Sequence, residues 1–268
     1  MKLTPRLTFQ IGRGRKKYLA RWLSPLLITF SIGMLFASSI AQAQQVPNDI
    51  WIQYLGIPIY DGPVTSVVIE EQTTEDDGSV FFQREIYDYD AAGMPMRFRS
   101  WITTSPPPGT TPDASKEWQY GRDGLPIIEL NRSAAGDAWE STINFDGATA
   151  FVEIPMPLLS ATRSATFDVD TNRVLSNVEY DNPSLDGFSE LYEFQANNRG
   201  YVYSNGTETR LVDQHGVEEL VESDTFGYRI TINVSDRDRY GNPLSARIQK
   251  SGLVSGDGTV RWTYEYAD

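Results

Sequence analysis

A short aromatic phrase recurs along this chain, and it constrains the fold more than any single residue does. One copy covers residues 87–96 (YDYDAAGMPM) and another covers residues 118–127 (WQYGRDGLPI). When aligned, the two agree in both aromatic residues, the glycine, the proline and the apolar residues on either side of the proline. A phrase repeated in this way indicates one supersecondary unit that is copied along the chain and packed against its neighbours.

Less regular copies follow, and their spacing indicates the size of the unit. Tyr89, Tyr120, Phe145, Val169 and Phe194 take equivalent places, at separations of 31, 25, 24 and 25 residues. About 25 residues suits a strand, a tight turn after the aromatic residue, and a return strand. In such a turn, aspartate hydrogen-bonds the backbone and glycine takes the left-handed conformation. The predicted repeat positions are Tyr87, Tyr89, Asp90, Gly93, Trp118, Tyr120, Gly124, Phe145, Phe194, Asp238, Gly241, Tyr264 and Tyr266.

Strand patterns dominate the rest of the chain. Residues 228–234, 244–248 and 260–266 alternate between apolar and polar side chains, which is typical of half-buried antiparallel strands. No window beyond the first 43 residues has a helical periodicity. We therefore expect an all-β fold: an antiparallel meander of hairpins in a long, coiling or partly closed sheet, built as one domain over residues 44–268. The proline-containing segments 105–115 and 154–161 are predicted to be loops.

The first 43 residues have the features of a secretory signal peptide. Seven basic residues and no acidic residue lie within residues 2–21, an apolar run covers residues 22–40, and Ala41-Gln42-Ala43 matches a signal-peptidase site. Cleavage there leaves Gln44 as the first residue. An uncleaved membrane anchor is the alternative, because the apolar run is long enough to span a bilayer. We expect export to the periplasm or the extracellular space, with no membrane-spanning segment in the mature chain.

Composition excludes several classes of function. Removal of the seven basic residues leaves 16 Lys and Arg against 36 Asp and Glu, a net charge of −20. Nucleic acids and anionic membrane surfaces both require a basic patch, so neither is an expected partner. The chain has no cysteine, which excludes disulfides, thiol nucleophiles and thiolate metal sites.

The phrases Tyr87-Asp88-Tyr89-Asp90-x-x-Gly93 and Asp238-x-x-Gly241-Asn242-Pro243 resemble the tyrosine–aspartate repeats of the Rhs/YD family. The resemblance covers about residues 83–268. It implies an exported or surface protein whose repeats form successive β-hairpins in a long coiling sheet. Many members are much longer, enclose a hollow shell and end in a toxin domain. Because this chain is short and ends inside a repeat, neither a toxin domain nor a closed shell is expected.

Few residues suggest catalysis or metal binding. His215, the one histidine, is expected to be an exposed turn residue, and no Gly-x-Ser-x-Gly motif accompanies it. Asp168, Asp170 and Asn172 have the opening spacing of a calcium loop, but the following glycine and the later glutamate are missing. An ordinary turn is the preferred interpretation there. No cofactor is expected, although turn carboxylates in an exported acidic protein can bind calcium weakly.

These observations predict a non-catalytic exported protein that binds a protein or glycan of the cell envelope. The first alternative is a periplasmic carrier that holds an apolar ligand, such as a lipid, in an open sheet. The second is a glycoside hydrolase that uses two of the many carboxylates. A solvent-accessible apolar cavity would favour the carrier. Facing carboxylates in a cleft ringed by tryptophan would favour the hydrolase.

Overall fold

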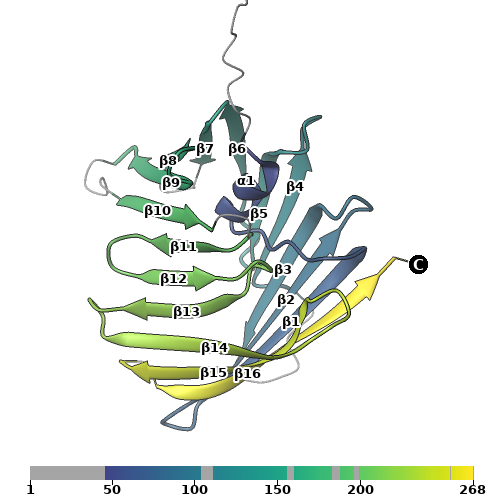
Figure 1. The fold of residues 1–268 in the computed structure, drawn as a ribbon, viewed down its shortest axis with the longest axis vertical. Coiled ribbons are helices and arrows are strands. Elements are labelled where there is room, and N and C mark those ends of the chain that lie inside the picture. The colour runs from purple at the N-terminus through teal and green to yellow at the C-terminus, as the bar shows by residue number, and fades with distance from the viewer. Residues whose placement is uncertain are drawn as a thin grey trace, which may run out of the picture. The chain divides into compact units, whose positions relative to one another are not determined.

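Alternation of apolar and polar side chains gives this chain a series of antiparallel strands. The computed structural model describes residues 46–103, 111–155, 160–182, 188–195, 199–253 and 255–267 (Figure 1). The strands are β1 (Val64–Glu75), β2 (Val80–Tyr89), β3 (Pro95–Thr103), β4 (Ala114–Tyr120), β5 (Pro126–Ser133), β6 (Ala138–Asp146), β7 (Thr149–Pro155), β8 (Ser160–Asp168), β9 (Arg173–Tyr180), β10 (Phe188–Phe194), β11 (Tyr201–Ser204), β12 (Thr209–Val212), β13 (Glu218–Ser223), β14 (Tyr228–Arg237), β15 (Pro243–Gly252) and β16 (Gly256–Tyr266). The all-β antiparallel meander expected from the sequence is confirmed.

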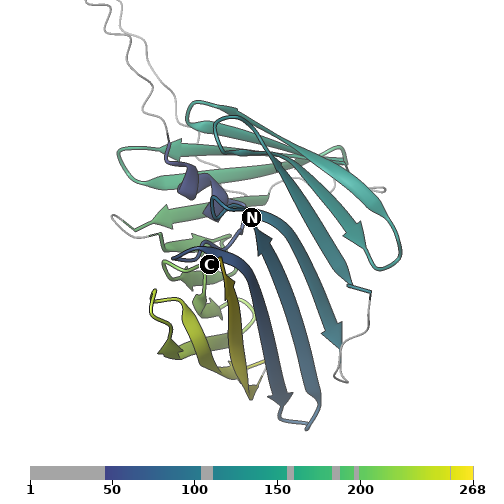
Figure 2. The same cartoon turned by 90° about the vertical axis from the view of Figure 1, so that its right-hand side faces the viewer.

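The sheet closes on itself. Each strand pairs with the next, and β16 returns to pair antiparallel with β1 from Val64↔Tyr266 to Glu75↔Gly256. Figures 1 and 2 show the last strand lying beside the first. Closure pairs the backbone groups that a free edge strand would leave exposed. The expectation of a coiling or partly closed sheet is therefore wrong, and so is the resemblance to the Rhs/YD repeats from which it partly came.

The aromatic–aspartate phrases lie at hairpin turns on one end of the barrel. Alternate turns of an antiparallel meander reach the same end, so the turns after β2, β4, β12 and β14 share one rim, which we call the plugged rim. In three of these turns one aspartate oxygen accepts two backbone amides: Asp90 binds Ala92 and Met94, Asp213 binds His215 and Val217, and Asp238 binds Tyr240 and Asn242. Gly93, Gly216 and Gly241 have φ values of 79°, 77° and 93°. The same local chemistry thus recurs in each turn.

One short helix departs from the sequence expectation. Helix α1 (Asn48–Tyr54) begins after Pro47 and buries Trp51, Ile52, Gln53 and Tyr54. The expectation of no helix was wrong, because seven residues make two turns, too few for a periodic pattern to be recognised. Packing rather than intrinsic propensity stabilises a helix this short.

The N-terminal segment, residues 46–63, crosses the plugged rim. The side-chain nitrogen of Asn48 donates to the carbonyl of Asp123 at 2.8 Å, and the Tyr89 hydroxyl donates to the carbonyl of Pro58 at 3.1 Å. Farther along, the Asp61 amide donates to Oδ1 of Asn242 at 2.8 Å, and Nδ2 of Asn242 donates back to the Asp61 carbonyl at 2.7 Å. Asn242 is fully buried and therefore acts as a two-point clamp on the segment.

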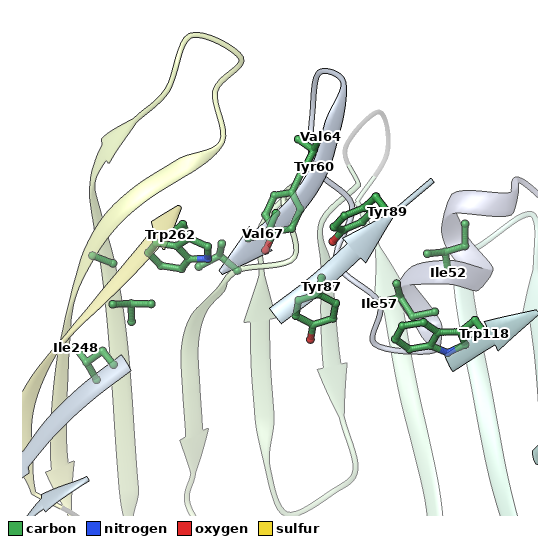
Figure 3. Packing of buried hydrophobic residues seen from close by; sticks show 13 residues of the cluster. Ile52, Ile57, Tyr60, Val64, Val67, Tyr87, Tyr89, Trp118, Ile248 and Trp262 are labelled. Atoms are coloured by element: carbon green, nitrogen blue, oxygen red, sulfur yellow. The ribbon is translucent and has the colours of Figure 1, made fainter. Parts of the chain in front are cut away.

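Two apolar clusters pack the N-terminal segment against the strands. In the first, Ile52, Ile57 and Tyr60 lie among strand residues that include Tyr87 and Trp262 (Figure 3). The second cluster contains Val46, Trp51, Leu125, Ala150, Ala165, Phe167, Val174, Tyr192 and Phe194. Since the segment contributes to both clusters, it fills space inside the barrel that the strands by themselves leave open.

Several sequence predictions fall outside the described residues. These include the signal peptide, the cleavage site at residues 41–43, and the prolines at positions 106–108 and 157. The described ends of the two predicted loops, residues 114–115, 154–155 and 160–161, belong to strands β4, β7 and β8, so the loops are shorter than expected. The part of the chain that the structure describes contains no helix long and apolar enough to cross a membrane. One compact unit, Ile40–Asp268, contains all the described residues.

Candidate ligand cavity

Alternate residues of neighbouring strands line a cavity inside the barrel. Residues paired directly across two strands point to the same face of a sheet, so Val152 faces inward with its partners Ile143 and Arg163. By the same rule Glu129 and Ser141 form an inward-facing pair. The cavity has a volume of about 300 Å³. It is lined by Leu55, Lys116, Glu129, Asn131, Trp139, Ser141, Ile143, Val152, Ile154 and Arg163.

The lining combines apolar and polar surface. Leu55 follows α1 and brings the N-terminal segment to the cavity wall, while Trp139, Ile143, Val152 and Ile154 come from the adjacent strands β6 and β7. The polar residues are Lys116, Glu129, Asn131, Ser141 and Arg163. A mostly apolar pocket with a few placed polar groups is typical of small-molecule sites.

The first cluster of polar side chains joins β4 and β5. The indole N–H of Trp118 donates to Oε2 of Glu129 at 2.9 Å. The ammonium of Lys116 lies 3.4 Å from Oε1 of Glu129 and 3.5 Å from Oε2, both longer than a well-formed charged hydrogen bond. The side chain of Lys116 is 38% exposed and that of Glu129 is 15% exposed. The ammonium of Lys116 is therefore accessible from the cavity, whereas the carboxylate of Glu129 is more deeply buried.

The second cluster of polar side chains surrounds Arg163 in β8. Its Nε donates to the Ser176 hydroxyl at 2.9 Å, and its Nη2 donates to the Tyr192 hydroxyl at 2.8 Å and also contacts Glu190. Tyr54 of α1 stacks beneath the guanidinium, with Cζ of Arg163 4.8 Å from the ring centroid. Burial raises the pKa of Tyr54 and of Tyr192, and the nearby Arg163 offsets part of each rise. The cluster is a packed network in which Glu190 is shielded from the cavity.

At the end opposite the plugged rim, which we call the open rim, several described inward-facing side chains are exposed. Phe81, Ile102 and Phe188 occupy inward-facing positions near the strand ends at this rim, as their cross-strand partners Thr73, Gln83 and Val178 show. These three apolar side chains are 44%, 61% and 40% exposed. Inward-facing apolar residues stay exposed only where no other side chain covers them. Among the described residues, the open rim therefore exposes part of the barrel interior.

A separate acidic region lies inward on β1 and β2. Burial raises the pKa of Glu71 and of Glu85, and the charge of Glu218 raises both further. The side chain of Gln83 donates to Glu85 at 2.7 Å. None of these carboxylates is among the residues that line the cavity, where Glu129 supplies the carboxylate. The facing pair expected of a glycoside hydrolase does not occur in the described lining of this cavity.

His215 occupies the predicted turn but is buried, not exposed. Its Nδ1 lies 3.7 Å from Oδ2 of Asp61, and its Nε2 lies 2.9 Å from Nε2 of Gln214. Burial lowers the pKa of His215, although the carboxylates of Asp213 and Asp61 act in the opposite direction. The expectation of an exposed residue was wrong because the N-terminal segment covers this turn.

The three calcium candidates lie in the turn between β8 and β9. Oδ1 of Asp168 accepts the amides of Asp170 and Thr171. The hydrogen bond of the Thr171 side chain, followed by these two amides, lowers the pKa of Asp168. The Asn172 side chain donates to the carbonyl of Phe194. Across the described ranges, no group of three or more His, Cys, Asp or Glu residues is arranged to hold a metal ion. Asp168 and Asn172 thus stabilise the turn.

Most aromatic side chains at the repeat positions are packed in the core of the barrel. Tyr87, Tyr89, Trp118 and Phe194 are buried. Phe145 packs on Trp51, with ring centroids 5.5 Å apart, and Tyr264 and Tyr266 stack at 6.0 Å. Tyr120 donates to the carbonyl of Pro95. Trp118 is the one repeat position directly linked to the cavity, through Glu129.

The cavity residues themselves escaped sequence reasoning. One signal was present: in β6, Trp139, Ser141 and Ile143 alternate with Glu140, Thr142 and Asn144. Charged residues at inward-facing positions, here Lys116 on β4, Glu129 on β5 and Arg163 on β8, indicate an interior that must supply partners or water to them.

Comparison with solved structures shows a likeness in backbone to other chains. A porin-like protein from Bacteroides uniformis is similar in backbone, with an alignment that covers 78% of this chain and 99% of that chain at 13% identity and a TM-score of 0.45. No protein-family model matches the sequence, and no curated protein matches it.

Proposed function

We propose that this protein is a non-catalytic, exported carrier that holds a small amphipathic ligand inside a water-facing β-barrel. The observation that carries the proposal is the interior cavity of about 300 Å³, lined by both apolar and charged side chains. The carrier alternative was expected to have an apolar cavity in an open sheet; this cavity lies in a closed barrel, and half of its lining residues are polar. The N-terminal segment crosses the plugged rim and packs inside the barrel, which favours a container over an open channel.

The outer face supports a barrel that is surrounded by water. Its side chains on β14, β15, β16 and β1 include Arg229, Thr231, Asn233, Arg247, Gln249, Ser251, Thr259, Arg261, Thr263, Glu70, Gln72 and Thr74. Transmembrane barrels have the opposite pattern, with an apolar outer band and a polar interior. The polar outer face of these four strands supports an aqueous envelope compartment, such as the periplasm. On β7 and β9 the outer face also carries exposed Phe151 and Leu175, and the interior holds charged side chains besides its two apolar clusters.

The interaction-module hypothesis remains a prediction, and closure of the sheet changes its basis. A partner that adds a strand requires a free edge. The barrel pairs β1 with β16, so the described strands offer no such edge. A partner would have to bind a rim or the outer face.

Native mass spectrometry tests the proposal. The full chain, expressed for export and released by osmotic shock without detergent, is expected to carry a bound organic ligand. Ser141→Phe fills the cavity from an inward-facing position, and Asn144→Phe places the same ring on the exposed outer face of the same strand. The first variant should lose the ligand and the second should keep it. A requirement for detergent, or an empty wild-type protein, would refute the proposal.

A further inference from the structure

The charged groups of the cavity are unequal in how far their hydrogen-bonding capacity is used. Glu129, the lining carboxylate, accepts the Trp118 indole at 2.9 Å and is also flanked by Lys116. Glu190 lies behind the wall, where the hydroxyls of Tyr192 and Tyr203 donate to it at 3.0 Å and 3.1 Å. Both acidic groups are therefore engaged by protein donors and offer little to a ligand.

Lys116 and Arg163 each have N–H donors that are not fully used by the described residues. The ammonium of Lys116 has three N–H groups, yet its described contacts are two long ones to a single carboxylate. In Arg163, the described hydrogen bonds of the guanidinium use Nε and Nη2, which leaves Nη1 without a partner among the described residues. The lining thus carries two cations against one engaged carboxylate, in a chain whose overall charge is negative.

Apolar surface completes the site. Trp139, Ile154 and Leu55 line the same cavity as Lys116. Lys116 pairs across the strands with Asn131, and Asn131 pairs with Trp139, so the three residues form one row of the sheet. When the acidic group of a ligand contacts Lys116, the apolar part of that ligand therefore packs against Trp139.

From this arrangement we infer that the cavity selects an anionic amphiphile: a carboxylate or phosphate monoester on an alkyl or aromatic body, with its acidic group bound by Lys116. This inference rests on the proposed carrier function and names its ligand class. A charged hydrogen bond in a partly enclosed site is stronger than a neutral one, so the acidic group is the main determinant of selectivity. Arg163 on the second wall is already ion-paired with Glu190, so Lys116 is the cation that discriminates between ligand charges.

Three probes with the same alkyl chain test the inference: decanoate, decanol and decyltrimethylammonium, titrated by calorimetry into the full chain after removal of bound ligand. Decanoate should bind about tenfold more tightly than decanol, which corresponds to about 1.4 kcal/mol, and the cation should bind most weakly. Lys116→Met should abolish the preference for decanoate while leaving the affinity for decanol unchanged. Lys116→Arg should keep the preference.

Lys250→Met is the matched control. Lys250 also faces inward, but it pairs with Glu75 at 3.0 Å and lies outside the cavity lining, so its loss should leave the preference intact. Thermal unfolding of each variant separates misfolding from loss of binding. Equal binding of decanoate and decanol, tighter binding of the cation, or a preference that survives Lys116→Met would overturn the inference and leave the carrier function standing. Failure of all three probes to bind would count against the carrier function itself.

Discussion

Asn242 offers the sharpest test of how the barrel is closed at the plugged rim. Its side chain joins residues 181 positions apart in sequence, accepting from the Asp61 amide at 2.8 Å and donating to the Asp61 carbonyl at 2.7 Å. Nδ2 also lies 3.2 Å from Oδ2 of Asp238. We expect Asn242→Ala to release the N-terminal segment locally and to lower the free energy of unfolding.

The expected loss of stability follows from the backbone groups of Asp61 that lose their hydrogen-bond partners. Removal of the side chain deprives one backbone amide and one carbonyl of their partners beside a fully buried position. An unsatisfied buried group costs about 1–3 kcal/mol, and water reaching the rim recovers part of this. The expected loss is about 2–4 kcal/mol. Asn242→Asp should be at least as damaging, because it removes the donor and places a second carboxylate beside Asp238.

Urea denaturation followed by circular dichroism measures the loss, and hydrogen exchange at residues 56–63 locates it. Asn233→Ala is the control, since Asn233 is exposed on the outer face of β14, and it should change stability by less than about 0.5 kcal/mol. A similarly small effect of Asn242→Ala, with unchanged exchange at residues 56–63, would refute the view that this clamp holds the segment.

Three further predictions concern the same segment and its contacts. Trp51→Ala should cost about 3–5 kcal/mol in urea denaturation, because Trp51 is only 1% exposed; a loss below 1 kcal/mol would mean that α1 does not support the core. Gly216→Ala should be more destabilising than Gly206→Ala: both have positive φ, but only at Gly216 does a new Cβ meet Pro58, at 3.1 Å, and equal losses would contradict this. Burial lowers the pKa of His215 in the folded protein, so its contribution to stability is present above about pH 6.5 and is lost as the pH falls through the lowered value. The stability of the wild type relative to His215→Gln should therefore decrease between pH 7 and pH 5, and parallel pH profiles would argue against it.

Much of the fold could be predicted from local chemistry. Alternation over residues 228–234 and 260–266 identified β14 and β16, and Asp-x-x-Gly turns placed their connections. Strand formation depends on neighbours two residues apart, and turn formation on four consecutive residues, so both are encoded locally. The helix Asn48–Tyr54 was not predictable in this way, because burial by distant strands stabilises it.

The site was much less predictable. Lys116, Glu129 and Arg163 come from β4, β5 and β8, and no spacing in the sequence connects them. His215 was expected to be exposed, because nothing near it in sequence shows that residues 58–61 cover it. A cavity is a property of which strands face each other, and that depends on register and closure rather than on composition.

Local patterns in this chain predict antiparallel hairpins with aromatic residues leading into aspartate–glycine turns. The pairing of β16 with β1, the burial of the aromatic rings and the packing of the N-terminal segment into one end of the barrel became evident from the fold. Turns and strand faces follow from contacts between close neighbours in sequence, whereas closure joins Val64 to Tyr266 and depends on the summed twist and register of every strand between them.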